Sequence, residues 1–156
     1  MTNYQPQNLP PAGVPLDLPY YGAPPVEAFK RFWKKYAVFH GRASRSEYWW
    51  WALASAIISG LINAIGSNGS GSTGASTALG GVWFLATVVP SLAVGARRLH
   101  DVNLGAWFLL LIVIPVLGWI ALLILMILPP NPKGQRFDRP MQAYPPYPQQ
   151  PYPPQA

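Results

Sequence analysis

The chain contains no cysteine, and this excludes disulfide bonds, thiolate nucleophiles and metal sites built on cysteine. Charge is also scarce: charged residues are 10% of the chain, against roughly 25% in soluble globular domains. No apolar run as long as a signal-peptide core, about 7–15 residues, precedes Tyr48, so we expect the first long apolar segment itself to direct insertion. Apolar residues gathered in blocks with little charge indicate lipid as the solvent.

The charged residues that do occur are mostly basic, and the formal net charge is +6 at pH 7. Such a surplus is compatible with nucleic-acid binding. The basic residues flank the apolar blocks, however, where anionic lipid headgroups are the nearer partner. We therefore expect membrane lipids as partners and no nucleic acid.

Three apolar blocks predict transmembrane helices over about residues 48–65, 79–96 and 105–128. The first block opens on the aromatic cluster Tyr48-Trp49-Trp50-Trp51, which is typical of a membrane–water interface. Pro90 is expected to bend the second helix, because proline removes a helical hydrogen bond and crowds the preceding turn.

The third block is interrupted by Pro115 and Gly118, so a kink in a single crossing or a re-entrant turn is an alternative to a straight helix. A segment of about twenty-four residues is too short to cross a bilayer twice as helix. Irregular backbone at the bend would also need burial against protein. The sequence therefore favours a single crossing.

Proline and glycine are concentrated at the two ends and in one connector. Residues 1–25 and 141–156 are predicted to be disordered, because these compositions bury too little apolar surface to offset the entropy of ordering the chain. The second tail is a spacer or a ligand for an SH3-like groove, and the spacer is favoured. Gly66–Thr77 is a flexible connector, and residues 26–140 form the helical membrane domain.

A basic amphipathic helix is predicted ahead of the first span. Apolar and aromatic residues recur at helical spacing, at Val26, Phe29, Phe32, Trp33, Tyr36 and Phe39. Basic residues fill the positions between them: Lys30, Arg31, Lys34 and Lys35. This pattern favours a helix in the membrane interface, with its cations at anionic headgroups, over a helix packed on the bundle.

The basic residues also predict the orientation. Six lysines and arginines precede the first span and the connector after it carries no charge, which places the N-terminus in the cytoplasm. Arg97 and Arg98 return the next connector to the cytoplasm. Three crossings then place the C-terminal tail outside, although Lys133, Arg136 and Arg139 oppose this.

Two charged clusters meet at this cytoplasmic face, one before the first span and one after the second. Together they contain Arg42, Arg45, Glu47, Arg97, Arg98, His100 and Asp101. Four guanidinium groups around two carboxylates predict an ion-pair network that ties the helix ends together.

His100 beside Asp101 raises the question of a general base with its carboxylate, or of half a metal site. Adjacent residues rarely reach either geometry, and His40 is the only other histidine. We therefore predict no catalytic residue, no metal and no cofactor, and a role in structure or headgroup binding.

The first span carries small residues at every fourth position: Ala52, Ala56, Gly60 and Ala64. Small side chains let another helix approach closely. The pattern predicts a helix-packing face, and a membrane-protein partner or a second copy of the chain is among the partners to consider.

The two charged clusters resemble the signature of the DUF805 family of bacterial inner-membrane proteins. The matching residues are Phe39, Gly41, Arg42, Arg45, Glu47, Tyr48 and Trp49, then Arg97 through Asp101. Trp107 and the pattern of Ile114, Pro115 and Gly118 are similar to the family's last span, whereas residues 103–106 and 135–138 depart from the usual motif. The resemblance implies a helical bacterial membrane protein and brings no agreed biochemical activity.

The expected fold is therefore an all-α membrane protein, with three transmembrane helices, a preceding interfacial helix and disordered proline-rich termini. The expected function is that of a noncatalytic protein of the bacterial plasma (inner) membrane, which binds lipid headgroups or membrane partners through its basic cytoplasmic face. A small transporter or channel subunit is the alternative, but its polar path would usually place ionisable groups within the spans, and these spans contain none. A membrane enzyme acting on lipids ranks third.

Overall fold

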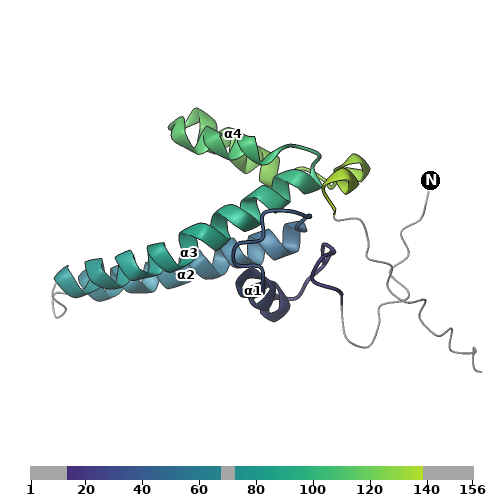
Figure 1. Cartoon of the computed structure of the whole chain (residues 1–156). Coiled ribbons are helices and arrows are strands. Elements are labelled where there is room, and N and C mark those ends of the chain that lie inside the picture. The colour runs from purple at the N-terminus through teal and green to yellow at the C-terminus, as the bar shows by residue number, and fades with distance from the viewer. Residues whose placement is uncertain (1–13, 68–72, 139–156) are drawn as a thin grey trace, which may run out of the picture.

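The computed structural model describes residues 14–67 and 73–138, and every regular element in this part of the chain is helical (Figure 1). In chain order the elements are α1 Pro25–Lys34, α2 Arg45–Ser67, α3 Thr73–Asp101, the 3-10 helix η1 Ala106–Val113, α4 Leu117–Ile127 and the 3-10 helix η2 Pro132–Phe137. The predicted all-α class is confirmed for these residues.

The two long helices, α2 and α3, run side by side in opposite directions (Figure 1). Their segments Arg45–Gly66 and Gly74–Asp101 are long and apolar enough to cross a membrane. Outward side chains such as Leu61 and Leu85 are exposed in the single chain, as lipid-facing side chains would be. These helices correspond to the first two predicted spans, and α3 continues through Pro90 to its end.

The prediction of one helix over residues 105–128 is wrong, because the segment is divided between η1 and α4. The break coincides with Pro115, which lacks a backbone N–H and forces the residue before it out of the helical region. Ile114 is accordingly extended, with φ −89° and ψ 105°. Val116 then adopts a φ of 63°, a left-handed conformation that few side chains favour, and the chain turns.

Gly118 allows the two halves of this turn to pack closely. A Cβ atom at this position would collide with the carbonyl group of Leu111 in η1. Trp119 stabilises the same turn by donating a hydrogen bond from Nε1 to the carbonyl oxygen of Ile112, at 3.0 Å. Residues 105–128 therefore form a tight helical hairpin.

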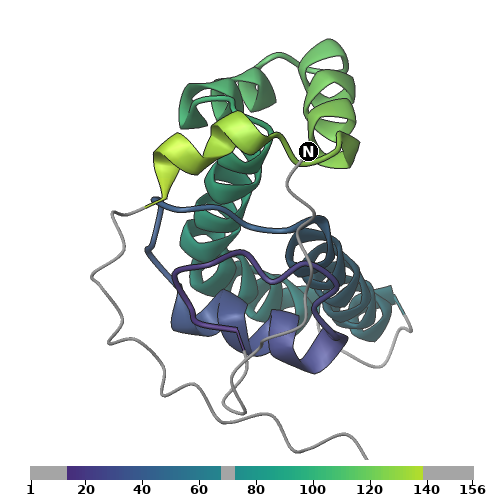
Figure 2. The ribbon, with the colours of Figure 1, turned by 90° about the vertical axis from the view of Figure 1, so that its right-hand side faces the viewer.

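Both ends of this hairpin lie at one end of the α2–α3 pair. Leu104, just before η1, donates its backbone N–H to Leu99 of α3, and Asn131, just after α4, donates to the carbonyl oxygen of Asp101 at 2.8 Å. Arg45 at the start of α2 reaches the carbonyl oxygen of Leu128 at 3.0 Å. Residues 128–138 consequently lie beside the start of α2 and the end of α3, where Figure 2 views the molecule end-on.

Helix α1 packs across the two long helices. Phe32 is buried and stacks on Trp51 of α2, with ring centroids 3.3 Å apart, and Val94 of α3 completes this small apolar core. Phe29 is partly exposed but also contacts Trp51, with ring centroids 6.0 Å apart, whereas Val26 is largely exposed. The predicted helix thus exists but ends at Lys34, and one of its faces is covered by protein.

The predicted tail of residues 1–25 does not hold for residues 14–24, which fold back over α1 and α2. Arg31 donates hydrogen bonds to the carbonyl oxygens of Val14, Pro15 and Leu18. Ser44 donates to the carbonyl oxygen of Tyr20 at 2.6 Å. The remainder of that tail and the predicted tail of 141–156 lie outside the described residues, as do residues 68–72 of the connector.

The predicted helix-packing face of α2 is not the face that meets α3. Ala56, Gly60 and Ala64 are exposed in the single chain, and a Cβ atom on Gly60 would meet nothing within 4 Å. The contact with α3 uses a neighbouring strip, where Ile62 lies 3.9 Å from the position of a Cβ on Gly80. Small residues alone could not show which side of α2 is covered, and a partner outside this chain stays a prediction.

Candidate functional site

The candidate site is the end of the molecule at which α2 begins and α3 ends, together with residues 14–44, 102–104 and 128–138 packed around it. We call it the polar end. All charged residues of the described part of the chain lie here, since none occurs between Glu47 and Arg97. Its side chains form three groups, centred on Asp101, on Asp138 and on Glu47.

Asp101, the last residue of α3, is fully buried. Its carboxylate accepts hydrogen bonds from Arg98 Nη1 at 2.8 Å and from the Tyr21 hydroxyl at 2.6 Å. Arg42 Nη1 lies 3.7 Å from the same carboxylate. Arg98 is also fully buried and donates to the backbone carbonyls of Met126 and Leu128. This pair therefore holds the end of α4 against α3.

Asp138 forms the second group by accepting two bonds from Arg42, from Nε at 2.9 Å and from Nη2 at 2.7 Å. Burial is the largest single influence on Arg42 and opposes its charged form, but the hydrogen bond to Asp138 and the charges of the surrounding groups, Asp101 among them, together outweigh it and raise the pKa of the guanidinium. Next to this pair, His100 stacks on Phe137 with ring centroids 4.1 Å apart. These contacts attach η2 to the start of α2 and the end of α3.

Glu47 forms the third group and has two tasks. Its side chain accepts the backbone N–H of Ser44 at 2.9 Å, while Ser44 Oγ accepts the backbone N–H of Glu47 at 3.2 Å. This reciprocal pair is a capping box that begins α2. The other oxygen of Glu47 accepts a bond from Arg31 Nη1 of α1 at 3.1 Å, and both side chains are buried.

Two buried cations have no carboxylate contact within the described residues. Arg97, 2% exposed, donates from Nε to the carbonyl oxygen of Ala93, four residues earlier on α3. Lys35, 6% exposed, lies just beyond α1. Burial lowers the pKa of the Lys35 ammonium to about 8; Glu47 acts in the opposite direction, and Arg97 and Arg31 add to the lowering.

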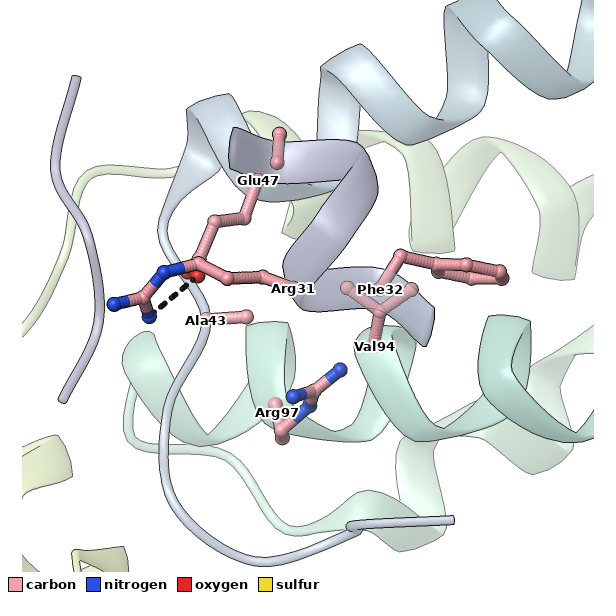
Figure 3. A pocket seen from close by; sticks show the side chains of 7 residues that line it. Arg31, Phe32, Ala43, Glu47, Val94 and Arg97 are labelled. Atoms are coloured by element: carbon pink, nitrogen blue, oxygen red, sulfur yellow. Dashed lines mark hydrogen bonds and ion pairs between the residues drawn. The ribbon is translucent and has the colours of Figure 1, made fainter. Parts of the chain in front are cut away.

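A small cavity lies between α1 and α3 beside these groups. Its volume of about 10 Å³ is enough for about one water molecule. It is lined by Ala28, Arg31, Phe32, Ala43, Glu47, Val94 and Arg97. Figure 3 shows Arg31 and Glu47 joined on one side and Arg97 rising from α3 on the other.

The side chains of His100 and Asp101, which are adjacent in sequence, have different hydrogen-bond partners. His100 Nδ1 lies 3.0 Å from the carbonyl oxygen of Gly41, whereas Asp101 bonds to Tyr21 and Arg98. The adjacent residues thus face different partners, which is not the arrangement of a base oriented by a carboxylate. Within the described residues, no three His, Asp or Glu side chains gather in a way that could hold a metal ion.

Sequence reasoning named seven residues of the polar end and missed others. The sequence predicts Arg31 on a lipid-facing surface and predicts no role for Tyr21 or Asp138, yet all three contact residues of the predicted network. One signal was present: Ser44 and Glu47 have the spacing of a capping box. The pairings of Tyr21 and Asp138 join positions 80 and 96 residues apart, and nothing local to the sequence encodes them.

Known proteins resemble this chain over its helical part. The inner membrane protein YhaI of Escherichia coli (strain K12) is 43% identical over 99 residues, covering 58% of this chain and 75% of the relative. The inner membrane protein YhaH of the same organism is 35% identical over 108 residues, covering 67% and 87%. No solved structure matches the chain.

The names of these relatives and the two long apolar helices together support a location in the membrane. The family model described as "Protein of unknown function (DUF805)" matches residues 36–139. That match contains the residues of all three groups of the polar end except Tyr21 and Arg31, which lie in residues 14–35 together with Lys35. The chain belongs to the DUF805 family.

Proposed function

We propose that this chain is a noncatalytic protein of the bacterial inner membrane that binds anionic lipid headgroups through its polar end. The main support for this proposal is the charge balance. The described residues include ten basic and five acidic side chains, all at this end. Anionic lipids attract such clusters with about 1 kcal/mol for each basic residue near the surface.

Only the exposed basic side chains of the polar end can contact lipid headgroups directly. Lys34, Arg45, Lys133 and Arg136 are exposed, as is Lys30, which pairs with Glu27. Arg31 and Arg98, by contrast, are buried and are held by carboxylates and carbonyls of the protein. Headgroup binding therefore belongs to the rim of the polar end, and the inner ion pairs have a structural task.

We further propose that α2 and α3 cross the membrane and that the η1–α4 hairpin enters it and returns. The helices η1 and α4 are each roughly 16 Å long, from 2.0 and 1.5 Å of rise per residue, which is about half of a bilayer core of roughly 30 Å. The bonds of Asn131 and Arg45 to neighbours at the polar end support a return to the starting face.

This arrangement places the N-terminal segment and residues 128–138 on one side, which the positive-inside rule assigns to the cytoplasm. It also accounts for Lys133 and Arg136, whose charges oppose a third crossing. The basic residues of both ends then face the same anionic leaflet.

Native mass spectrometry of the full chain, released from detergent with added lipid, tests the binding. We expect more retained phosphatidylglycerol than phosphatidylcholine, and loss of this preference when Lys30, Lys34, Lys133 and Arg136 are changed to glutamine. The control replaces four exposed apolar residues of the spans, Leu53, Leu61, Val82 and Leu85, by alanine. Equal retention of both lipids by the unchanged chain would refute headgroup binding, and ion flux through liposomes carrying it would favour a channel subunit.

A further inference from the structure

Arg97 is a buried cation whose two terminal nitrogens are not used by the described part of the chain. Its side chain is 2% exposed, and its one hydrogen bond there runs from Nε to the Ala93 carbonyl oxygen. Arginine is permanently charged and presents its Nη groups as a fork suited to two acceptor oxygens. The Arg97 side chain lines the cavity and its terminal nitrogens are not fully enclosed, so an anion could reach them there, and such an anion would stabilise the largely buried charge.

The surroundings supply less negative charge than Arg97 requires. Glu47 is the carboxylate on the wall of the cavity, but it is bonded to Arg31 and to the backbone of Ser44. Lys35 does not line this cavity but a neighbouring one, together with exposed Asp17, and it adds another buried positive charge within electrostatic range of Arg97 and Glu47. Three buried cations thus share one buried carboxylate, so the interior between α1 and α3 carries a net positive charge.

The cavity lies where a compensating anion would sit. It is bounded by Arg97 of α3, Arg31 of α1 and the apolar side chains of Ala28, Phe32 and Val94 (Figure 3). Its volume of about 10 Å³ accepts one oxygen-sized group. A phosphate has to place only one of its oxygens here to contact the guanidinium.

We propose that Arg97, with Lys35 in support, forms a binding site for a phosphate group between α1 and α3. The ligand is an oxyanion of phosphate chemistry, because one of its oxygens fits the cavity beside the Arg97 guanidinium and the Lys35 ammonium nearby adds a compact positive charge. The phosphate of an anionic lipid and free inorganic phosphate share this chemistry. The lipid source rests on the function proposed above; the site itself does not.

The site is distinct from the exposed rim in two respects. It is built partly by residues 14–35, which lie outside the family match, and its cations are buried whereas those of the rim are exposed. Removing the rim charges should therefore leave it intact. Conversely, Arg97→Met should leave lipid binding by the rim cations largely unchanged.

Isothermal titration of the detergent-solubilised full chain with inorganic phosphate tests the proposal, at constant ionic strength and with sodium chloride as the comparison salt. We expect saturable phosphate binding, a weakening of tenfold or more in Arg97→Met, and a smaller weakening in Lys35→Met. Leu85→Ala, which shortens an exposed apolar side chain of a span and changes no charge, is the control and should bind phosphate as the unchanged chain does.

A second variant keeps the test decisive if Arg97→Met does not fold. Ala28→Val adds two methyl groups at a cavity wall and leaves every charge in place, so it should also weaken phosphate binding at least tenfold. The lipid arm repeats the comparison with phosphatidylglycerol and phosphatidylcholine vesicles in phosphate-free buffer, observed by phosphorus NMR.

The outcomes separate the two proposals. Binding in the phosphate or the phosphatidylglycerol arm that depends on Arg97 or on the open cavity supports the site and identifies its source. Affinities unchanged in the folded variants, an equal response to chloride, or no binding in either arm would overturn it. Loss of lipid preference in the rim variant, with phosphate binding intact, would leave both proposals standing independently.

Discussion

At the scale of single residues, Asp101 is the carboxylate whose burial depends most on its hydrogen-bond partners. It is fully buried and accepts bonds from Arg98 and Tyr21, with Arg42 nearby. Asp101→Asn removes the charge that compensates a fully buried arginine, and breaking such a pair costs about 3–5 kcal/mol. We expect a large drop in the thermal midpoint of the detergent-solubilised protein.

The matched control is Glu27→Gln, which breaks the exposed pair with Lys30. Exposed pairs contribute little, because solvent screens them and the long side chains lose entropy. We expect no measurable change for this variant. Similar losses in both variants would mean that burial of the Asp101 group is overstated.

Lys35 predicts a dependence of stability on pH. Its pKa is lowered from 10.5 to about 8 in the folded chain, first because of burial. Between these two values the unfolded chain binds more protons than the folded chain, so folding stability rises with pH over this window. Below about pH 8 the group is charged in both states, and the cost of burying the charge is fully present.

Thermal midpoints measured from pH 7.5 to 10.5 in phosphate-free buffer check this expectation. The unchanged chain should gain stability relative to Lys35→Met as the pH rises through about 8. Comparison with the variant cancels the titration of other groups. A constant difference between the two proteins over this range would show that the pKa of Lys35 is not lowered.

At the scale of elements, the η1–α4 hairpin depends on one glycine. A Cβ on Gly118 would collide with the backbone carbonyl of Leu111, whereas a Cβ on Gly60 would meet open space. Gly118→Ala should therefore destabilise the protein by about 1–3 kcal/mol, as overpacking does. Gly60→Ala should be neutral or slightly stabilising, because alanine favours helix over glycine. Equal effects in thermal unfolding would contradict the tight turn.

The ties between elements are also separable by double-mutant cycles. Arg98 pairs with Asp101, and Arg31 of α1 pairs with Glu47 of α2. Each of these pairs should show a coupling energy of about 0.5–3 kcal/mol. The cycle that combines Arg98→Gln with Glu47→Gln should be additive, since no contact joins those side chains. Coupling in that cycle, or none in the other two, would contradict the pairing described here.

The existence of the helices could be predicted from the sequence more completely than the contacts between them. Long apolar blocks define α2 and α3 because length and hydropathy are local properties, and Pro115 indicated a break in the third block. The hydrogen bond from Asn131 to Asp101, which favours the proposed return over a crossing, joins residues that are distant in sequence. Likewise, the spacing of aromatic residues predicted α1, but which of its faces packs on Trp51 required the tertiary structure.

At the scale of the whole molecule, the charged residues of the described part of the chain are confined to one end. The described charges lie at the polar end, and the rest of α2, α3 and the hairpin exposes apolar side chains such as Leu61, Val82 and Leu117. This distribution is consistent with apolar helices embedded in the bilayer and one charged end exposed to water. It requires residues on both sides of the spans, before Arg45 and after Leu128, to share that face.

The absence of cysteine permits a direct test of this central claim, because an introduced cysteine is then the only thiol. Single variants Lys30→Cys, Ser70→Cys and Lys133→Cys are exposed to a membrane-impermeant maleimide in intact cells with a permeable outer membrane, and again after lysis. The account predicts labelling of Ser70→Cys in intact cells, and labelling of Lys30→Cys and Lys133→Cys only after lysis. Labelling of Lys133→Cys but not Lys30→Cys in intact cells would show that residues 105–128 cross the membrane, and it would contradict a single polar end.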